Sequence, residues 1–167
     1  GGLSAAIALK KIAGIQATVF EQSNKHDEVG AGVTIAPNAC RVLDKLGLLD
    51  PMQRAGAIPD GHGVYMDAMG HVVTDAAWED SAGRYQNIGM YRPDMIDILA
   101  KAVDPAAIRL HHRAQSVEML DCGVRVHFEN DKQEDFDAVI GADGIRSVVR
   151  KAVGQPTNFV YSGFMAY

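Results

Sequence analysis

Residues 137–150 constrain the fold of this chain more than any other segment. An apolar run at 138–140 leads into Gly-Ala-Asp-Gly at 141–144, and a helix follows. A continuous apolar run is typical of a strand covered on both faces, and the glycines let the backbone turn sharply beside a ligand. Asp143 supplies a carboxylate for hydroxyl groups. The segment therefore predicts a buried strand and a ligand-binding turn; the alternative is an ordinary loop in which Asp143 or Ser147 caps the helix.

The amino end indicates a second part of a nucleotide site. Gly1 and Gly2 open a run of small and apolar residues typical of a helix that packs closely on a sheet, and a β-rich run at 16–20 follows. Glu21 stands 19 positions after Gly2. This is near the spacing of about 20 at which an acidic residue binds a ribose hydroxyl. If Gly2 is the third glycine of a G-x-G-x-x-G loop, the chain is a fragment whose first strand precedes residue 1. Helix packing alone also explains a glycine pair.

Another glycine-rich stretch, at 28–38, leads through a short strand into a helix. We expect this helix over 38–46, with Asn38 as its cap and Gly47 as its stop. Arg41 lies in its first turns, either as a solvated helix residue or as a ligand of an anion. The expected apolar face consists of Val42, Leu43 and Leu46.

The acidic strand end at Glu21, the Gly-Ala-Gly-Val loop at 30–33 and the Asp-Gly turn at 143–144 together resemble the para-hydroxybenzoate hydroxylase family. Within this family of FAD-dependent aromatic hydroxylases, the salicylate-hydroxylase-like branch is the most similar, and the resemblance spans essentially the whole chain. It implies an α/β fold: a Rossmann-like FAD-binding domain with an antiparallel meander, plus part of an inserted β-sheet substrate domain.

The element pattern supplies boundaries for these domains. We expect residues 1–57 and 92–156 to form the FAD-binding domain, residues 58–91 to form part of the substrate-domain sheet, and residues 157–167 to begin its next strand. The inserted sheet would contain a hairpin around the turn at 67–70 and a third run within 85–91. Further elements are predicted as helices at 49–55 and from Arg92, and as strands at 108–111, 115–120, 124–128 and 136–140.

The resemblance also implies a cofactor, a reaction and a set of residues. FAD would be bound and reduced by NADH or NADPH, and dioxygen would form a flavin hydroperoxide that hydroxylates a small phenolic or hydroxy-heteroaromatic acid. Glu21 would hold the adenosine ribose, Gly2 would lie under the pyrophosphate, and Gly32 and Val33 would pass beside the isoalloxazine. No catalytic side chain is assigned. The ribityl–pyrophosphate region would be bound by Arg41, Arg92 and Asp143, with Gly1 and Gly144 also counted among the cofactor-binding residues.

Composition fits small-molecule ligands. A net charge of −5 without a long basic run argues against nucleic acid or an anionic membrane as the main partner, and no apolar run approaches the roughly 18 residues of a spanning helix. We expect a cytoplasmic protein, with a homodimer as the candidate assembly. Cys40 and Cys122 form no metal or redox motif, and adjacent strand residues such as His111 and His112 point to opposite faces, so no metal site is predicted.

Two other interpretations stay open. One is a different FAD-dependent oxidoreductase of the same architecture, such as an oxidase or a dehydrogenase, which never uses a hydroperoxide. The other is a non-catalytic fragment, because a strand left without its neighbour exposes unpaired backbone groups.

Overall fold

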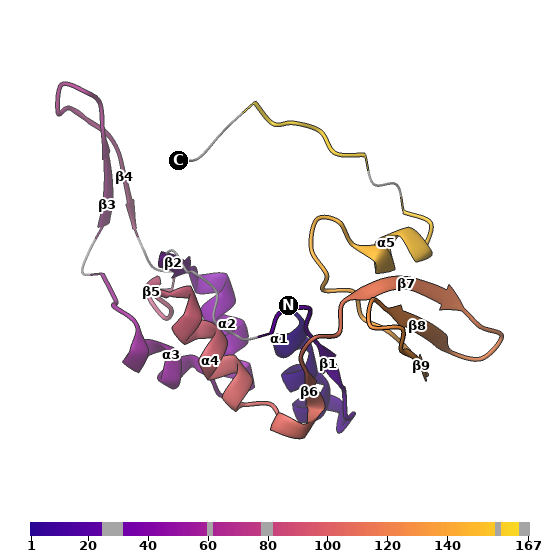
Figure 1. Cartoon of the computed structure of the whole chain (residues 1–167). Helices are drawn as coiled ribbons and strands as arrows, with labels where there is room; N and C mark the ends of the chain where they lie inside the picture. The colour runs from indigo at the N-terminus through magenta and orange to yellow at the C-terminus, as the bar shows by residue number, and fades with distance from the viewer. Residues whose placement is uncertain (25–31, 60–61, 78–81, 156–157, 164–167) are drawn as a thin grey trace. The chain divides into compact units, whose positions relative to one another are not determined.

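The computed structural model describes residues 1–24, 32–59, 62–77, 82–155 and 158–163 (Figure 1). The chain divides into two compact units, and each is described by itself. The first unit consists of Gly1–Gly2, Val19–Asn24 and Arg109–Tyr167, and the second of Leu3–Thr18 and Lys25–Ile108.

The longest helices of the described residues lie in the second unit. α1 (Gly2–Ala8) continues into a short π-helical turn, η1 (Leu9–Ala13), which ends at Gly14 in the left-handed conformation (φ 66°). A left-handed residue at this position is a common helix stop because glycine adopts it without a steric cost. Ala6 and Ile7 are the buried residues of α1.

The helix after the second glycine-rich stretch, α2 (Pro37–Leu46), begins one residue earlier than predicted. Ala36 is the N-cap and Pro37 is the first helical residue, because the fixed φ of proline is already suited to a helix start. The prediction that Asn38 caps the helix is wrong: its Oδ1 accepts a hydrogen bond from the N–H of the next residue, Ala39, at 2.9 Å. Gly47 stops the helix at φ 75°, as predicted.

The apolar face of α2 is narrower than predicted. Leu43 and Leu46 are buried together with Cys40, whereas Val42 is 55% exposed. Cys40, Leu43 and Leu46 are spaced three positions apart along one face of the helix, and Val42 lies at the edge of that face, about 100° around the helix from Leu43. The next helix, α3 (Leu49–Ala55), has the predicted bounds and buries Met52.

One short sheet of the second unit joins two distant segments. β2 (Gly32–Ile35) pairs antiparallel with β5 (Ile88–Tyr91), in a register that places Gly32 opposite Tyr91 and Ile35 opposite Ile88. The expectation that the run within 85–91 belongs to the inserted sheet is not met, because its backbone partners lie on β2. α4 (Arg92–Lys101) follows β5 directly and buries Leu99.

The predicted hairpin is present. β3 (His62–Met66) pairs antiparallel with β4 (Val72–Ala77), and Figure 1 shows the two strands as a long β-hairpin. The turn is closed by Asp67, whose Oδ1 accepts hydrogen bonds from the N–H groups of Met69 at 2.8 Å and His71 at 2.9 Å. An aspartate that bonds the backbone two residues on is typical of such turns.

Strands dominate the first unit. β1 (Val19–Phe20) pairs with β6 (Ile108–Arg109), which follows the 3-10 turn η2 (Pro105–Ala107). β7 (Ala114–Met119), β8 (Val124–Phe128) and β9 (Gln133–Phe136) form an antiparallel meander, as predicted, but its third strand lies earlier in the sequence than the predicted 136–140. An aromatic cluster lies beside the buried residues Val124, Val126 and Phe128 of this unit: the Phe20 ring lies 4.8 Å from Phe128 and 5.5 Å from Phe136, measured between centroids.

The end of the meander differs from the prediction. Strand pairing ends at Phe136, and residues 138–140 have no assigned strand partner among the described residues. Ile140, expected to be buried, is 61% exposed. An apolar run becomes a buried strand only where neighbouring strands supply ladder hydrogen bonds. The helix expected after the turn is present as α5 (Val148–Ala152), which packs against β7.

None of the helices in the described part of the chain combines the length and the apolar character that a bilayer crossing requires.

Candidate functional site

The start of α1, the start of β1 and the Gly-Ala-Asp-Gly turn meet in the first unit. A Cβ atom added to Gly1 would lie 3.2 Å from the Cβ of Ala142, closer than side chains normally approach. A Cβ added to Gly2 would lie 3.7 Å from Cγ1 of Val19 and 3.8 Å from the Cβ of Ala142. The helix start is therefore packed tightly against the turn at Gly1, and makes ordinary van der Waals contact with the turn and with β1 at Gly2.

Asp143 is fixed by the beginning of α5. Its Oδ1 accepts a hydrogen bond from the Ser147 hydroxyl at 2.6 Å, and its Oδ2 accepts the N–H groups of Val148 at 2.7 Å and Val149 at 3.3 Å. Burial raises the pKa of Asp143, but these hydrogen bonds outweigh it, so the pKa is lowered and the carboxylate is ionised at neutral pH.

Both interpretations of the turn at 141–144 are therefore compatible. Asp143 binds the helix start, and Ser147 is the N-cap of α5 because its Oγ accepts the N–H of Arg150 at 2.9 Å. An ionised carboxylate has about four acceptor positions, and three hydrogen bonds leave capacity for a ligand hydroxyl. Asp143 is thus able to cap a helix and to accept a hydrogen bond from a ligand.

Glycine suits positions 141 and 144 of this turn for two different physical reasons. A Cβ at Gly141 would lie 2.7 Å from the Cβ of Val149, so only glycine fits against α5. Gly144 has a φ of 77°, in the left-handed region that other residues rarely adopt. The Arg150 guanidinium folds back and donates to the carbonyl of Ile145, which agrees with a structural role for Arg150.

Glu21 lies at the end of β1 and is half-buried. Its backbone N–H donates to the carbonyl of Arg109 at 2.9 Å, and its own carbonyl accepts the N–H of His112 at 3.0 Å. Its Oε1 accepts the N–H of Ser23 at 2.9 Å. The backbone of Glu21 is thereby fixed by the neighbouring segment, and its carboxylate is held at the strand end, where it was predicted to meet a ribose.

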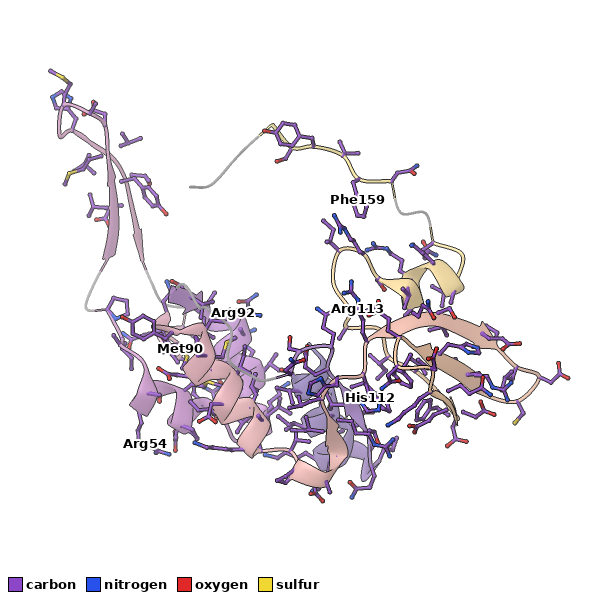
Figure 2. The ribbon with its side chains drawn as sticks, viewed as in Figure 1. Arg54, Met90, Arg92, His112, Arg113 and Phe159 are labelled. Atoms are coloured by element: carbon purple, nitrogen blue, oxygen red, sulfur yellow. The ribbon has the colours of Figure 1, made fainter. Side chains whose placement is uncertain are left out.

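His112 belongs to the aromatic core near this strand end. Its ring centroid lies 5.6 Å from that of Phe20 and 5.2 Å from that of Phe128 (Figure 2). His111 and His112 were expected to point to opposite faces of a strand. This expectation is wrong, because His111 has a φ of 57° and lies outside any strand. Across the described residues, no group of three or more His, Cys, Asp or Glu side chains is arranged to hold a metal ion.

The second unit contains the other four predicted cofactor residues. The register of β2 with β5 places Gly32 opposite Tyr91, the residue before Arg92, and Val33 opposite Met90. Arg92 is half-buried and begins α4 (Figure 2). A Cβ added to Gly32 would meet none of the described residues within 4 Å. Residues 28–31 of the glycine-rich loop lie outside the described residues.

Arg41 lies against a buried tyrosine that sequence reasoning missed. The guanidinium carbon of Arg41 is 5.9 Å from the centroid of the Tyr85 ring, within the range of a cation–π contact. Tyr85 donates a hydrogen bond from its hydroxyl to Oδ2 of Asp44 at 2.7 Å. Arg41 and Asp44 are three positions apart on α2, which puts them on one helix face. That spacing is visible in the sequence, but the position of Tyr85 is not.

These residues suit FAD chemically. Carboxylates at Glu21 and Asp143 are acceptors for ribose and ribityl hydroxyls, and the guanidinium groups of Arg41 and Arg92 suit a pyrophosphate. Gly1 packs against Ala142 with little room for a side chain, and no described atom lies within 4 Å of the Cβ position of Gly32. Of the predicted cofactor residues, Gly1, Gly2, Glu21, Asp143 and Gly144 lie in the first unit, and Gly32, Val33, Arg41 and Arg92 lie in the second.

Comparison with known proteins agrees with this chemistry. A family model described as "FAD binding domain" matches residues 1–164. The chain is 35% identical to 3-amino-4-hydroxybenzoate 2-monooxygenase of Streptomyces cremeus, over 91% of the chain and 39% of that protein. It is 27% identical to 6-hydroxynicotinate 3-monooxygenase of Pseudomonas fluorescens, over 99% of the chain and 44% of that protein.

A solved structure gives the same result for the fold. Klebsiella pneumoniae HpxO, complexed with FAD and uric acid, superposes with a TM-score of 0.78 and 25% identity, covering 93% of this chain and 40% of that one. The chain therefore spans less than half the length of the relatives it matches. The resemblance to FAD-dependent aromatic hydroxylases and the α/β fold class inferred from the sequence are confirmed. With a match over residues 1–164, the chain belongs to the FAD binding domain family.

Proposed function

We propose that the whole protein is an FAD-dependent monooxygenase that hydroxylates a phenolic or hydroxy-heteroaromatic acid, using NADH or NADPH and O2. The observation that carries this proposal is the match of nearly the whole chain to the FAD binding domain, together with relatives named as monooxygenases. Both relatives reported above are named for aromatic acids that carry a ring hydroxyl. This shared chemistry supports the substrate class.

The residues of the chain would act mainly by binding and orienting the cofactor. Glu21 would accept hydrogen bonds from the adenosine ribose, and Asp143 from a ribityl hydroxyl, while Arg41 and Arg92 would balance the charge of the pyrophosphate. Bound FAD supplies the activation of oxygen. Each hydrogen bond to a charged group contributes about 1.5–3 kcal/mol, so a small set of side chains suffices for tight binding.

Oxygen and product measurements on the whole protein test the reaction. Salicylate-like or hydroxynicotinate-like acids should stimulate NADH or NADPH oxidation, with equal oxygen uptake and a hydroxylated ring as the product. Benzoate, which lacks the ring hydroxyl, is the control and should yield no hydroxylated product. Hydrogen peroxide as the sole oxygen product, for every phenolic acid tried, would instead support an FAD-dependent oxidase of the same fold.

Assembly and location are separate proposals. A homodimer in the cytoplasm remains the expectation from the sequence. Sedimentation of the whole protein at several concentrations tests the oligomeric state, and a monomer at all concentrations would overturn it.

A further inference from the structure

Tyr85 connects the segment before β5 to α2, the helix that contains Arg41. The side chain is only 8% exposed, and its hydroxyl donates to Asp44 of α2 at 2.7 Å. The next residue, Gln86, makes a second connection, because its carbonyl accepts a hydrogen bond from the Sγ of Cys40 on the same helix at 3.3 Å. The position of the Tyr85 ring relative to α2 is therefore set by two hydrogen bonds.

The Tyr85 ring also contacts two arginine side chains. The guanidinium carbons of Arg41 and Arg84 lie 5.9 and 5.6 Å from the Tyr85 centroid. The pKa of Tyr85 is raised above its usual value, mainly by the hydrogen bond to Asp44 and secondly by burial of the side chain. The phenol therefore remains neutral at physiological pH, and its hydroxyl continues to donate a hydrogen bond to Asp44. A neutral ring held in one orientation presents a constant face to the Arg41 side chain.

We propose that Tyr85 is a positioning residue, which holds the Arg41 guanidinium in the orientation that binds the phosphate region of FAD. This inference rests on the proposed function, in which Arg41 contacts the cofactor. An arginine side chain loses much rotamer freedom when it binds a ligand, and a contact that already restricts it reduces that loss. Tyr85 would then increase FAD affinity without touching FAD.

A double-mutant cycle on the whole protein tests this role. The dissociation constant of FAD is measured by titrating the apoprotein for Arg41→Ala, Tyr85→Leu and the double variant. Arg41→Ala should weaken binding about tenfold or more, since a charge-assisted hydrogen bond is lost. Tyr85→Leu should weaken it about two- to fivefold, the size of a cation–π contact. The double variant should bind no more weakly than Arg41→Ala alone, because Tyr85 acts only through Arg41.

Controls separate positioning from folding. Arg54→Ala removes an exposed arginine from the last turn of α3 and should leave FAD affinity unchanged (Figure 2). Thermal unfolding of each apoprotein reports structural damage. If Tyr85→Leu does not fold, Tyr85→Phe replaces it in the cycle: it keeps the ring but loses the anchor to Asp44, and a smaller, equally non-additive loss is expected.

The possible failures are distinguishable. Losses at Arg41 and Tyr85 that simply multiply in the double variant would overturn the positioning role, as would unchanged affinity in Tyr85→Leu. Unchanged affinity in Arg41→Ala would overturn the inference while the proposed function stands. A wild-type apoprotein that takes up no FAD would overturn both.

Discussion

The carboxylate of Asp143 accepts three hydrogen bonds from the residues that begin α5, and a ligand hydroxyl would be a further donor to the same group. Sequence reasoning offered a helix cap and a ligand-binding residue as alternatives at this position. The geometry shows why they need not compete: the cap bonds fix the carboxylate, and a fixed carboxylate loses less freedom when it binds. The pKa of Asp143 is correspondingly lowered.

This lowered pKa predicts a pH-dependent contribution to stability. A carboxyl group whose pKa is lower in the folded state than its unfolded value of about 3.9 stabilises the protein above that value, and the contribution is lost as the pH falls through the folded pKa. Urea unfolding of the wild-type and Asp143→Asn apoproteins, measured between pH 3 and pH 7, tests this contribution. The wild type should be more stable above about pH 4, and the difference should shrink below it. A difference independent of pH would contradict this assignment.

At the scale of elements, sequence patterns were most successful where a local signal decides the structure. Gly47 ends α2, and the hairpin and the meander form where turn residues separate alternating strands. The errors occur where a distant partner decides. Residues 138–140 need strand neighbours, β5 pairs with β2 rather than with the hairpin, and Tyr85 reaches α2 from 41 positions beyond Asp44. Nothing local in the sequence encodes these pairings.

Gly141 and Gly32 should respond differently to the same substitution. Gly141→Ala should destabilise the apoprotein by about 1–3 kcal/mol, because the added Cβ would lie 2.7 Å from the Cβ of Val149 and overpack α5. Gly32→Ala should change stability by less than about 0.5 kcal/mol, since its Cβ would meet nothing within 4 Å, but it should weaken FAD binding if β2 passes beside the flavin. Chemical denaturation and FAD titration measure the two effects, and equal destabilisation by both variants would contradict the packing described.

At the scale of the whole molecule, the predicted cofactor residues come from segments far apart in the sequence, and both compact units contribute to them. The sequence could identify these segments because glycine pairs, acidic strand ends and Asp-Gly turns are local signals with a chemical reason. It could not identify a catalytic side chain, because in this chemistry the cofactor carries the reaction and the protein mainly binds and orients. The substrate class therefore rests on the relatives and on product analysis.

The flavin content of the purified whole protein tests the central claim most directly. The wild type should purify yellow or take up FAD on reconstitution. Glu21→Ala and Asp143→Ala should each lose most of the flavin, because each removes charge-assisted hydrogen bonds of about 1.5–3 kcal/mol, around tenfold or more in affinity. Absorbance near the flavin band, corrected for protein concentration, gives the occupancy of each variant. A colourless wild-type protein that binds no FAD on reconstitution would contradict the account.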